Sequence, residues 1–322
     1  MRVLVTGGTG FVGSAVVRIL LSQGLDVRCL VRPNSNLSNL QGLKVELVNG
    51  DLLDPDSLQG ALRDCVQLYH VAALYSTRPE DAALMQRINV EGTCNLLKAA
   101  VEMGLRRIVY TSTIGTIGRP AGKKLPTESD IYEDWSRVSP YARSKLEAER
   151  IALDLAAQGA SIVVVNPCAP VGARDIKPSS TGQRILDYLR GRIPSFLPGG
   201  INFVSVEDVA VGHLLAAERG RVGERYILGH GEGNLSLEDF YALMEQASGL
   251  PRPQAGRLTP GLLRRGMHRL RRGLRRDTLR DLRPPALTAD PSRAIRELGL
   301  PQTPLIEAFR QAVTWFREHG YA

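Results

Sequence analysis

"RVLVTGGTGFVG" (residues 2–13) leads from a short apolar strand through a glycine-rich turn into an amphipathic helical pattern. Gly8, Gly10 and Gly13 match the pattern G-x-G-x-x-G, and Gly7 adds one more position that tolerates any backbone conformation. In such a turn the glycines permit the tight bend, the approach of a pyrophosphate to the backbone, and close packing of helix on strand. The helix N-terminus adds free N–H groups and a positive dipole end. The stretch therefore predicts a dinucleotide-binding site.

The first half of the chain repeats this order of strand and helix. The strand-like runs are nearly continuous in apolar residues, which is typical of parallel strands covered on both faces. They lie at 2–6, 26–31, 44–50, 66–72, 107–112 and 161–166. Helical patterns lie between them, at 11–23, 55–64, 80–103 and 140–158. The alternation predicts an α/β fold with a doubly wound parallel sheet.

After Pro167 the alternation stops, and two long connections rich in proline and glycine follow. A strand pattern at 202–206, a helical pattern and a strand pattern at 225–229 are expected to return to the main sheet. We therefore predict a dinucleotide-binding domain, 1–170 with 202–230. The remainder, 171–201 with 231–322, is expected to form a smaller, mostly helical substrate lobe over the carboxyl edge of the sheet, where α/β proteins bind ligands.

The bulk composition is that of an ordinary globular protein, with 43% hydrophobic and 23% charged residues among 322. No apolar run approaches the about 20 residues that span a bilayer, and the N-terminus reads as a strand rather than a signal peptide. We expect a cytoplasmic protein. The four cysteines and five histidines show no spacing of the kind that metal sites use, so no metal is expected.

The net charge of +8 is local. Between Arg257 and Arg283 there are ten arginines and two aspartates, so the rest of the chain is neutral and nucleic-acid binding is not indicated. Within 262–284 an apolar stripe with helical spacing lies among the arginines. One interpretation is a lobe helix that packs this stripe over the pocket. The other is a weak, salt-sensitive contact with an anionic membrane surface.

The ends of the second and third strands bear on the choice of cofactor. NAD-binding turns place a carboxylate at the end of the second strand, where this chain has Arg32. An arginine fork suits a 2′-phosphate, so NADP is favoured over NAD, with a solvated arginine as the alternative. Asp51 could accept from an adenine amino group or cap the next helix, although Asp54 suits the cap better.

Hydroxyl groups follow the fifth strand in "VYTSTIGTIG" (109–118), and "SPYARSK" (139–145) begins the next long helix. Ser139 and Pro140 are typical of a helix N-terminus, which places Tyr141 and Lys145 in the first turns beside this loop. A nearby ammonium favours the phenolate and lowers a tyrosine pKa. We therefore predict that Tyr141 exchanges a proton with a substrate oxygen.

These motifs together resemble the extended short-chain dehydrogenase/reductase superfamily. The pieces are "TGGTGFVG", "GDL" (50–52), "NVEGT" (89–93), "VYTST", "YARSK", "NPCAPVG" (166–172) and "VSVEDVA" (204–210). Within it the chain is most similar to dihydroflavonol-reductase-like proteins, which include a branch described as hopanoid-associated sugar epimerases.

The resemblance implies a Rossmann-type domain with Tyr141, Lys145 and Thr113 as the catalytic group. Thr113 would orient the substrate oxygen, Lys145 would also hold the nicotinamide ribose, and Pro167 would lie against the nicotinamide ring. Asn89 would support either a water or its own helix. The implied cofactor contacts are Gly7, Gly10, Phe11, Val12, Gly13, Arg32, Asp51, Leu52, Val71, Ala72, Ala73, Thr111, Tyr141, Lys145 and Pro167.

Reductase and epimerase activities would share all of these residues. Related sugar-nucleotide epimerases carry an arginine and a histidine where this chain has Ile201 and Ser205, so a diphosphate would need Arg174, Lys177 or the basic segment. We therefore favour an NADP-linked carbonyl reductase or alcohol dehydrogenase acting on a mainly apolar small molecule. The alternatives are an NAD(P)-dependent sugar epimerase or dehydratase, and a cofactor-binding protein without turnover.

The helices at 80–103 and 140–158 correspond to those that pair in the dimers of many relatives. We therefore expect a homodimer, with a monomer as the alternative because the sheet could use the same apolar positions.

Overall fold

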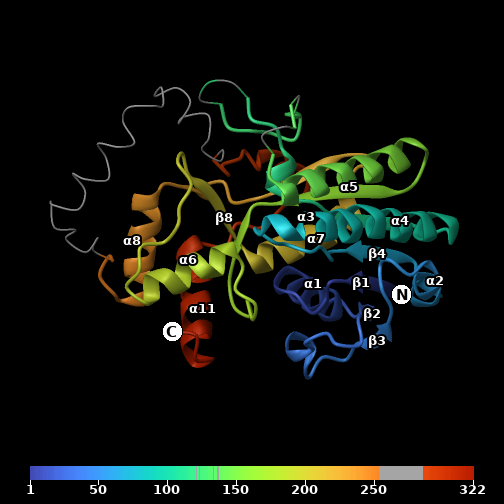
Figure 1. The fold of residues 1–322 in the computed structure, drawn as a ribbon, viewed down its shortest axis with the longest axis horizontal. Helices are drawn as coiled ribbons and strands as arrows, with labels where there is room; N and C mark the ends of the chain where they lie inside the picture. Colours follow the sequence, from blue (N-terminus) through green and yellow to red (C-terminus); the bar gives the residue numbers. More distant parts are fainter. Residues whose placement is uncertain (121, 123, 133, 136–137, 254–285) are drawn as a thin grey trace.

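The computed structural model describes all residues except 121, 123, 133, 136–137 and 254–285. The basic segment 257–283, and with it the expected amphipathic helix at 262–284, lies outside the described residues. Figure 1 shows the main sheet on the right and the smaller lobe on the left. None of the described helices combines the length and the apolar composition that a bilayer-spanning segment needs.

Seven parallel strands form the main sheet, in the order β3-β2-β1-β4-β5-β6-β9. They are β1 (Arg2–Thr6), β2 (Asp26–Val31), β3 (Glu46–Asn49), β4 (Gln67–His70), β5 (Arg107–Thr111), β6 (Ile162–Pro167) and β9 (Arg225–Leu228). The chain winds outward on one side of β1 and then returns to β4 on its other side. This reversal confirms the doubly wound fold and places a ligand-binding crevice at the carboxyl ends of β1 and β4.

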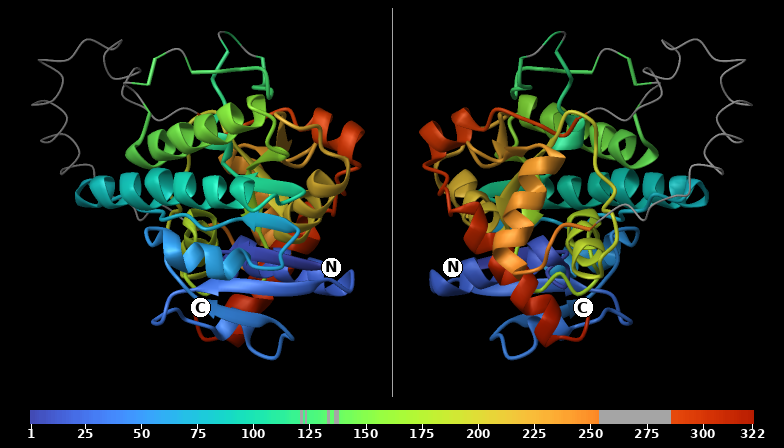
Figure 2. Two further views of the ribbon diagram at one scale, coloured as in Figure 1. Left: turned by 90° about the vertical axis from the view of Figure 1, so that its right-hand side faces the viewer. Right: turned by 90° about the vertical axis from the view of Figure 1, so that its left-hand side faces the viewer.

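Helices cover both faces of this sheet. Val3 and Val5 pack into one buried cluster with α1 (Phe11–Ser22) and α7 (Val206–Arg219). Leu4, whose side chain points to the opposite face, belongs to a second cluster. The helices of that second face are α2 (Pro55–Leu62), α4 (Gly92–Glu102) and α5 (Pro140–Ala157). Figure 2 shows this layered arrangement from both sides.

A second, three-stranded sheet has the order β10-β8-β7. Its strands are β7 (Ala169–Val171), β8 (Ile201–Ser205) and β10 (Asn234–Leu235). They form a third core with the helices α6 (Ser180–Leu189), α8 (Leu237–Ser248) and α11 (Leu305–Glu318). The expected return of 202–206 to the main sheet is therefore wrong for this strand, whereas α7 and β9 do return. Ser205 ends β8 by capping α7, its hydroxyl accepting from the backbone N–H of Glu207 at 3.2 Å.

The single helix expected at 80–103 is interrupted. It consists of η2 (Pro79–Asp81), α3 (Ala82–Met85), a π-helical turn η3 (Gln86–Glu91) and α4. The remaining short elements are η1 (Ser38–Leu40), η4 (Ile114–Thr116) and η5 (Ala294–Leu298). A π-helical turn widens the helix locally and is often found beside functional sites. Here it contains Asn89, which lies next to the candidate site described below.

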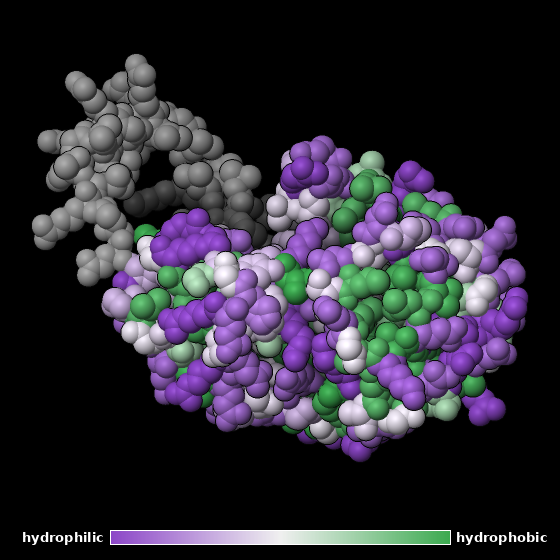
Figure 3. Space-filling view, turned by 90° about the horizontal axis from the view of Figure 1, so that it is seen from below, coloured by the Kyte–Doolittle hydropathy of each residue, from purple (hydrophilic) through white to green (hydrophobic). Residues whose placement is uncertain are grey.

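The outermost strand β3 leaves an apolar edge on the underside of the molecule. Leu47 in this strand is 43% exposed and Leu37, in the preceding connection, is 39% exposed. Both line one shallow hollow. Figure 3 views the molecule from below, where hydrophobic residues (green) gather on the right among hydrophilic ones. Because β3 has only four residues, this free edge offers little length for pairing with another strand.

Candidate active site

The glycine turn after β1 is shaped by two close contacts. Gly7 has φ +74°, and a Cβ there would lie 2.7 Å from the backbone nitrogen of Ala72. A Cβ on Gly13 would collide with the carbonyl oxygen of Gly7. Gly10 is different, because its nearest neighbour would be that same oxygen at 3.3 Å. Gly7 therefore makes the bend and Gly13 lets α1 pack against it, while Gly10 has the carbonyl oxygen of Gly7 as its one close neighbour.

The first turn of α1 can accept an anion. Gly10 is the N-cap and supplies no side-chain cap. Within the described residues, the backbone N–H groups of Phe11 and Val12 have no hydrogen-bond partner, whereas Ser14 already donates to Gly10. Unpaired N–H groups at the positive end of a helix dipole, beside a glycine without a side chain, fit the pyrophosphate of a dinucleotide.

The two residues predicted to contact the adenosine half lie at the ends of β2 and β3. Arg32 is exposed, and its guanidinium makes no hydrogen bond or ion pair with the part of the chain that the structure describes. Asp51 accepts the backbone N–H of Leu53 through Oδ1 at 2.9 Å. Asp54 caps α2 by accepting from Asp56, so the capping role does not fall to Asp51. Both predicted side chains thus keep hydrogen-bonding capacity for a ligand.

The segment after β4 passes along the glycine turn. Val71 donates its N–H to the carbonyl oxygen of Thr6, Val71 and Ala72 are half-buried, and Ala73 is exposed. Asn89 then fixes the next residue by two bonds: Leu74 N–H donates to Oδ1 at 2.7 Å, and Nδ2 donates to the Leu74 carbonyl at 2.9 Å. Asn89 therefore clamps this segment, a role that sequence reasoning missed.

Tyr141 lies where the sequence predicted it, in the first turn of α5. Ser139 caps this helix by accepting from Ala142 at 3.2 Å. The Tyr141 ring meets the ring of Tyr75 edge to face, with centroids 4.9 Å apart and planes at 82°. Burial, with a smaller contribution from Tyr75, raises the pKa of Tyr141. The prediction that Lys145 lowers this pKa is therefore wrong for the structure as it stands.

Lys145 is directed at the end of β5 instead. Its Nζ donates to the carbonyl oxygen of Thr111 at 2.7 Å and lies 4.4 Å from the centroid of the Tyr110 ring. The side chain is 1% exposed, and burial lowers the pKa of Lys145 to about 7, while Glu149 favours the charged form. The amine therefore titrates near neutral pH.

Thr113 is held by its backbone, which leaves much of its hydroxyl free. The hydroxyl accepts the N–H of Gly115 at 3.2 Å, and the carbonyl accepts from Thr116 at 2.8 Å and from Asn166 at 3.3 Å. Asn166 stands at the end of β6, directly before the buried Pro167. Lys145 thus joins α5 to the end of β5 through Thr111, and α5 approaches the loop of Thr113 where Ala142 lies close to Gly115.

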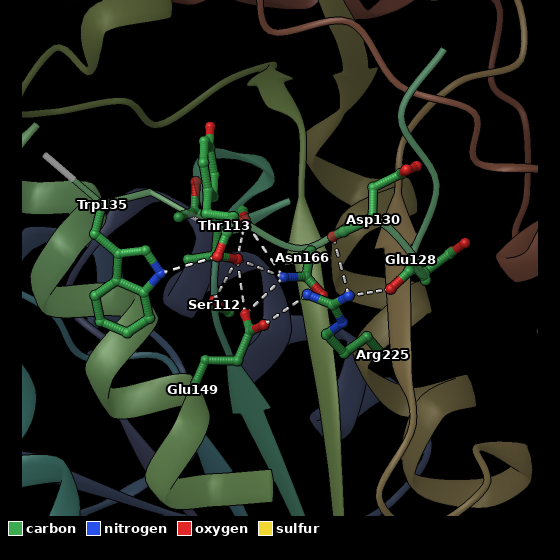
Figure 4. A network of polar contacts seen from close by, with 10 residues as sticks. Ser112, Thr113, Glu128, Asp130, Trp135, Glu149, Asn166 and Arg225 are labelled. Atoms are coloured by element: carbon green, nitrogen blue, oxygen red, sulfur yellow. Dashed lines mark hydrogen bonds and ion pairs between the residues drawn. The ribbon is translucent and has the colours of Figure 1, made fainter. Parts of the chain in front are cut away.

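A buried carboxylate supports this loop (Figure 4). Glu149 is 3% exposed and accepts from Thr116 at 2.7 Å, from Asn166 at 2.9 Å and from Arg225 at 3.1 Å. Arg225, on β9, also reaches the carbonyl oxygens of Glu128 and Asp130. Sequence reasoning missed this network. One signal was present, because Glu149 lies four residues after Lys145 and so shares its helix face.

Comparisons with known proteins agree with this geometry. Residues 3–229 match the NAD dependent epimerase/dehydratase family. A protein named dihydroflavonol 4-reductase from Synechocystis sp. is 42% identical over 98% of this chain and 95% of its own length. Sterol demethylase protein B of Methylococcus capsulatus is 37% identical over 99% of both chains. The crystal structure of gox2253 superposes with a TM-score of 0.86 at 40% identity, over 99% of both chains. The chain therefore belongs to the NAD-dependent epimerase/dehydratase family and is an NAD(P)-dependent enzyme of the extended short-chain dehydrogenase/reductase type.

Proposed function

We propose that this enzyme is an NADP-linked carbonyl reductase, or the corresponding alcohol dehydrogenase, acting on a mainly apolar small molecule. The proposal is supported by the position of Tyr141 in the first turn of α5, with its ring against Tyr75. The next residue, Ala142, lies close to Gly115 in the loop of Thr113, since a Cβ on Gly115 would be 3.6 Å from that of Ala142. Two similar proteins, one named as a reductase and one as a sterol-processing protein, support a carbonyl or alcohol group on an apolar skeleton.

The residues of the site fit a nicotinamide dinucleotide. The N–H groups of Phe11 and Val12 would hold the pyrophosphate, with Arg32 at a 2′-phosphate. Asp51 would accept from the adenine and Lys145 would hold the nicotinamide ribose. When bound, the nicotinamide supplies or takes up the hydride.

The chain's own residues supply the proton. A raised pKa keeps the proton on Tyr141 at neutral pH, which suits donation to a carbonyl oxygen as it gains negative charge. Thr113 would orient that oxygen by a hydrogen bond. The reverse reaction needs the phenolate, which the same burial disfavours.

The alternative function, sugar epimerase, is less well supported by the residues of β8. Ile201 is fully buried in β8, and Ser205 is used to cap α7, so neither offers a charge to a diphosphate. Asn202, between them, is also committed, with Nδ2 donating to the carbonyl oxygen of His230. We assign substrate selection to 171–201 and 231–322, whose described part includes β10 and the helices α6, α8 and α11.

The test has two stages. Affinities for NADPH and NADH are first measured in parallel by titration of the nicotinamide fluorescence, for the natural protein, for Arg32→Ala and for Arg150→Ala. Arg150 is a matched control, because its side chain is 76% exposed on α5. We expect NADPH to bind more tightly and only Arg32→Ala to reduce this preference. Tighter NADH binding would contradict the NADP assignment.

A panel of apolar ketones and aldehydes is then screened with the tighter cofactor, beside a panel of nucleotide sugars. Oxidation of the reduced cofactor in proportion to the product formed would support the reductase proposal. Interconversion of a sugar without net change in cofactor would establish the epimerase instead.

A further inference from the structure

Arg174 holds a backbone conformation that a residue with a side chain seldom adopts. Its φ is +74°, and among the described residues only Asp64 is another non-glycine with positive φ. Such conformations persist where the surroundings enforce them, and they gather at ligand sites.

The carbonyl of Arg174 is tied to the glycine turn. Asn39, which is 3% exposed, donates from Nδ2 to the carbonyl oxygen of Thr9 and to that of Arg174, both at 3.2 Å. Arg18 on α1 holds Asn39 in turn, donating to its carbonyl oxygen at 3.0 Å. One buried amide thus joins the dinucleotide turn to a loop of the small lobe.

The other side of Arg174 is tied to the start of α6. Asp175, 2% exposed, accepts the backbone N–H of Ser179 with both carboxylate oxygens and also accepts its hydroxyl at 2.8 Å. Farther along, the Tyr321 hydroxyl donates to the carbonyl oxygen of Ile176 at 2.7 Å. The loop is therefore fixed from both directions, and the strained backbone of Arg174 is a consequence.

The guanidinium of Arg174 is exposed and makes no hydrogen bond or ion pair within the described part of the chain. The neighbouring carboxylate of Asp175 is occupied by Ser179. Burial lowers the pKa of Arg18, and the positive charge of Arg174 contributes to the shift, so the two cations lie near each other. An uncompensated planar cation beside a phosphate-binding turn is suited to a phosphate.

We propose that Arg174 binds a phosphate group of the dinucleotide from the side of the small lobe, opposite the N-terminus of α1. The inference rests on the proposed function, since it requires a dinucleotide on the turn. It adds a cofactor contact from outside the dinucleotide-binding domain and couples the position of the lobe to cofactor occupancy. The phosphate is either the pyrophosphate, which NADH and NADPH share, or the 2′-phosphate of NADPH.

The experiment compares the natural protein with Arg174→Gly, Arg174→Ala and the control Arg150→Ala. Glycine accepts a positive φ without strain, so Arg174→Gly keeps the loop while removing the charge. We expect unchanged or higher thermal stability for Arg174→Gly and nucleotide affinity lower by roughly tenfold, the effect of one charge-assisted hydrogen bond. A weaker dependence of affinity on salt should accompany the loss.

An equal loss of affinity for NADH and NADPH would show that Arg174 binds the pyrophosphate. A loss of affinity for NADPH alone would show that it binds the 2′-phosphate. If the natural protein binds both nucleotides and Arg174→Gly binds them equally well, the inference is wrong while the proposed function stands. If only binding of a nucleotide sugar weakens, Arg174 serves a substrate diphosphate and the inference is overturned. A natural protein that binds neither nucleotide would instead refute the proposed function.

Discussion

The amine of Lys145 lies 2.7 Å from the carbonyl oxygen of Thr111, which fastens the first turns of α5 to the carboxyl end of β5. This bond explains why Tyr141, one helical turn earlier, stands at the same edge as the loop of Thr113. The bond also occupies one N–H of Lys145 that could otherwise donate to the hydroxyl of Tyr141. Lys145 therefore positions α5 in addition to its proposed contact with the cofactor.

Replacing Tyr141 by phenylalanine should abolish proton transfer and keep the edge-to-face contact with Tyr75. We expect turnover to fall about a hundredfold to ten-thousandfold, with cofactor affinity nearly unchanged. Steady-state kinetics with a substrate from the screen would check this. Tyr75→Phe is the control and should leave most of the activity, because it retains the ring contact. Undiminished turnover in Tyr141→Phe would refute the assigned role.

Glu149 should set the pH range of activity through Lys145. Its carboxylate favours the ammonium of Lys145, whose pKa burial has lowered to about 7. Glu149→Gln removes that charge, so the pKa of Lys145 should fall further. If turnover needs the ammonium, the alkaline limb of the pH–rate profile moves to lower pH. Asp154→Asn, an exposed change on the same helix, should leave the limb in place. An unshifted limb in a folded Glu149→Gln protein would show that Lys145 is not the titrating group.

Gly13→Ala should damage the dinucleotide turn, because the new Cβ collides with the carbonyl oxygen of Gly7. Overpacking of this kind costs about 1–3 kcal/mol of folding stability. Where the turn shifts to relieve the collision it loses its fit to the pyrophosphate, and we expect nucleotide binding weaker by roughly tenfold to a hundredfold. Gly60→Ala is the matched control, since a Cβ on this exposed helical glycine meets nothing within 4 Å. It should raise stability by up to about 1 kcal/mol without changing affinity. Calorimetry and nucleotide titration measure both quantities.

Two buried histidines should make the protein sensitive to acid. Burial lowers the pKa of His70 to about 3 and that of His213 to about 4. Nδ1 of His213 donates to the Val209 carbonyl. Because its lowered pKa keeps the ring neutral, Nε2 accepts from the Thr111 hydroxyl. The unfolded chain takes up protons below pH about 6.5 that the folded protein does not.

The unfolding free energy should therefore fall as pH drops from about 6.5 to 4, by up to about 1.4 kcal/mol per pH unit for each histidine. Denaturant unfolding at several pH values measures the slope. His213→Asn should flatten it, whereas the exposed His319→Gln should not. An equal slope in the natural protein and His213→Asn would contradict the neutral assignment of His213.

We expect a homodimer through the outward faces of the π-helical turn, α4 and α5. The described residues form a shallow groove there, which includes Val90, Cys94 and Ile151. Light scattering at micromolar concentration should give the mass of two chains, and Val90→Glu should shift it toward one. A monomer mass for the natural protein would contradict this expectation.

The sequence predicted the features that depend on residues close together in the chain. The glycine turn and the Ser139 cap of α5 require only a few neighbouring residues, and the structure places both as expected. The sheet to which β8 belongs depends on its pairing with β7 and β10, which no local pattern encodes. The clamp of Asn89 on Leu74 and the cluster of Glu149, Asn166 and Arg225 were missed for the same reason, because they too join residues that are distant in the sequence.

The pKa of Tyr141 was predicted in the wrong direction for a related reason. The four-residue spacing to Lys145 is visible in the sequence, whereas the acceptor that takes up the amine, the carbonyl of Thr111, lies on a strand thirty-four residues away. Burial then raises the pKa of the phenol. The four-residue spacing thus places Tyr141 and Lys145 on one helix face, but it does not determine which group each side chain contacts.

The contact of Gly7 with Ala72 has a consequence for how the protein matures. The glycine turn takes its shape only when β4 has paired with β1, because Val71 and Ala72 both donate hydrogen bonds to Thr6. Contacts between distant parts of a chain form late in refolding. Nucleotide capture during refolding should therefore follow assembly of the sheet centre rather than precede it. Once bound, a nucleotide would protect that centre by mass action, so its supply would govern how long a newly made chain resists proteolysis.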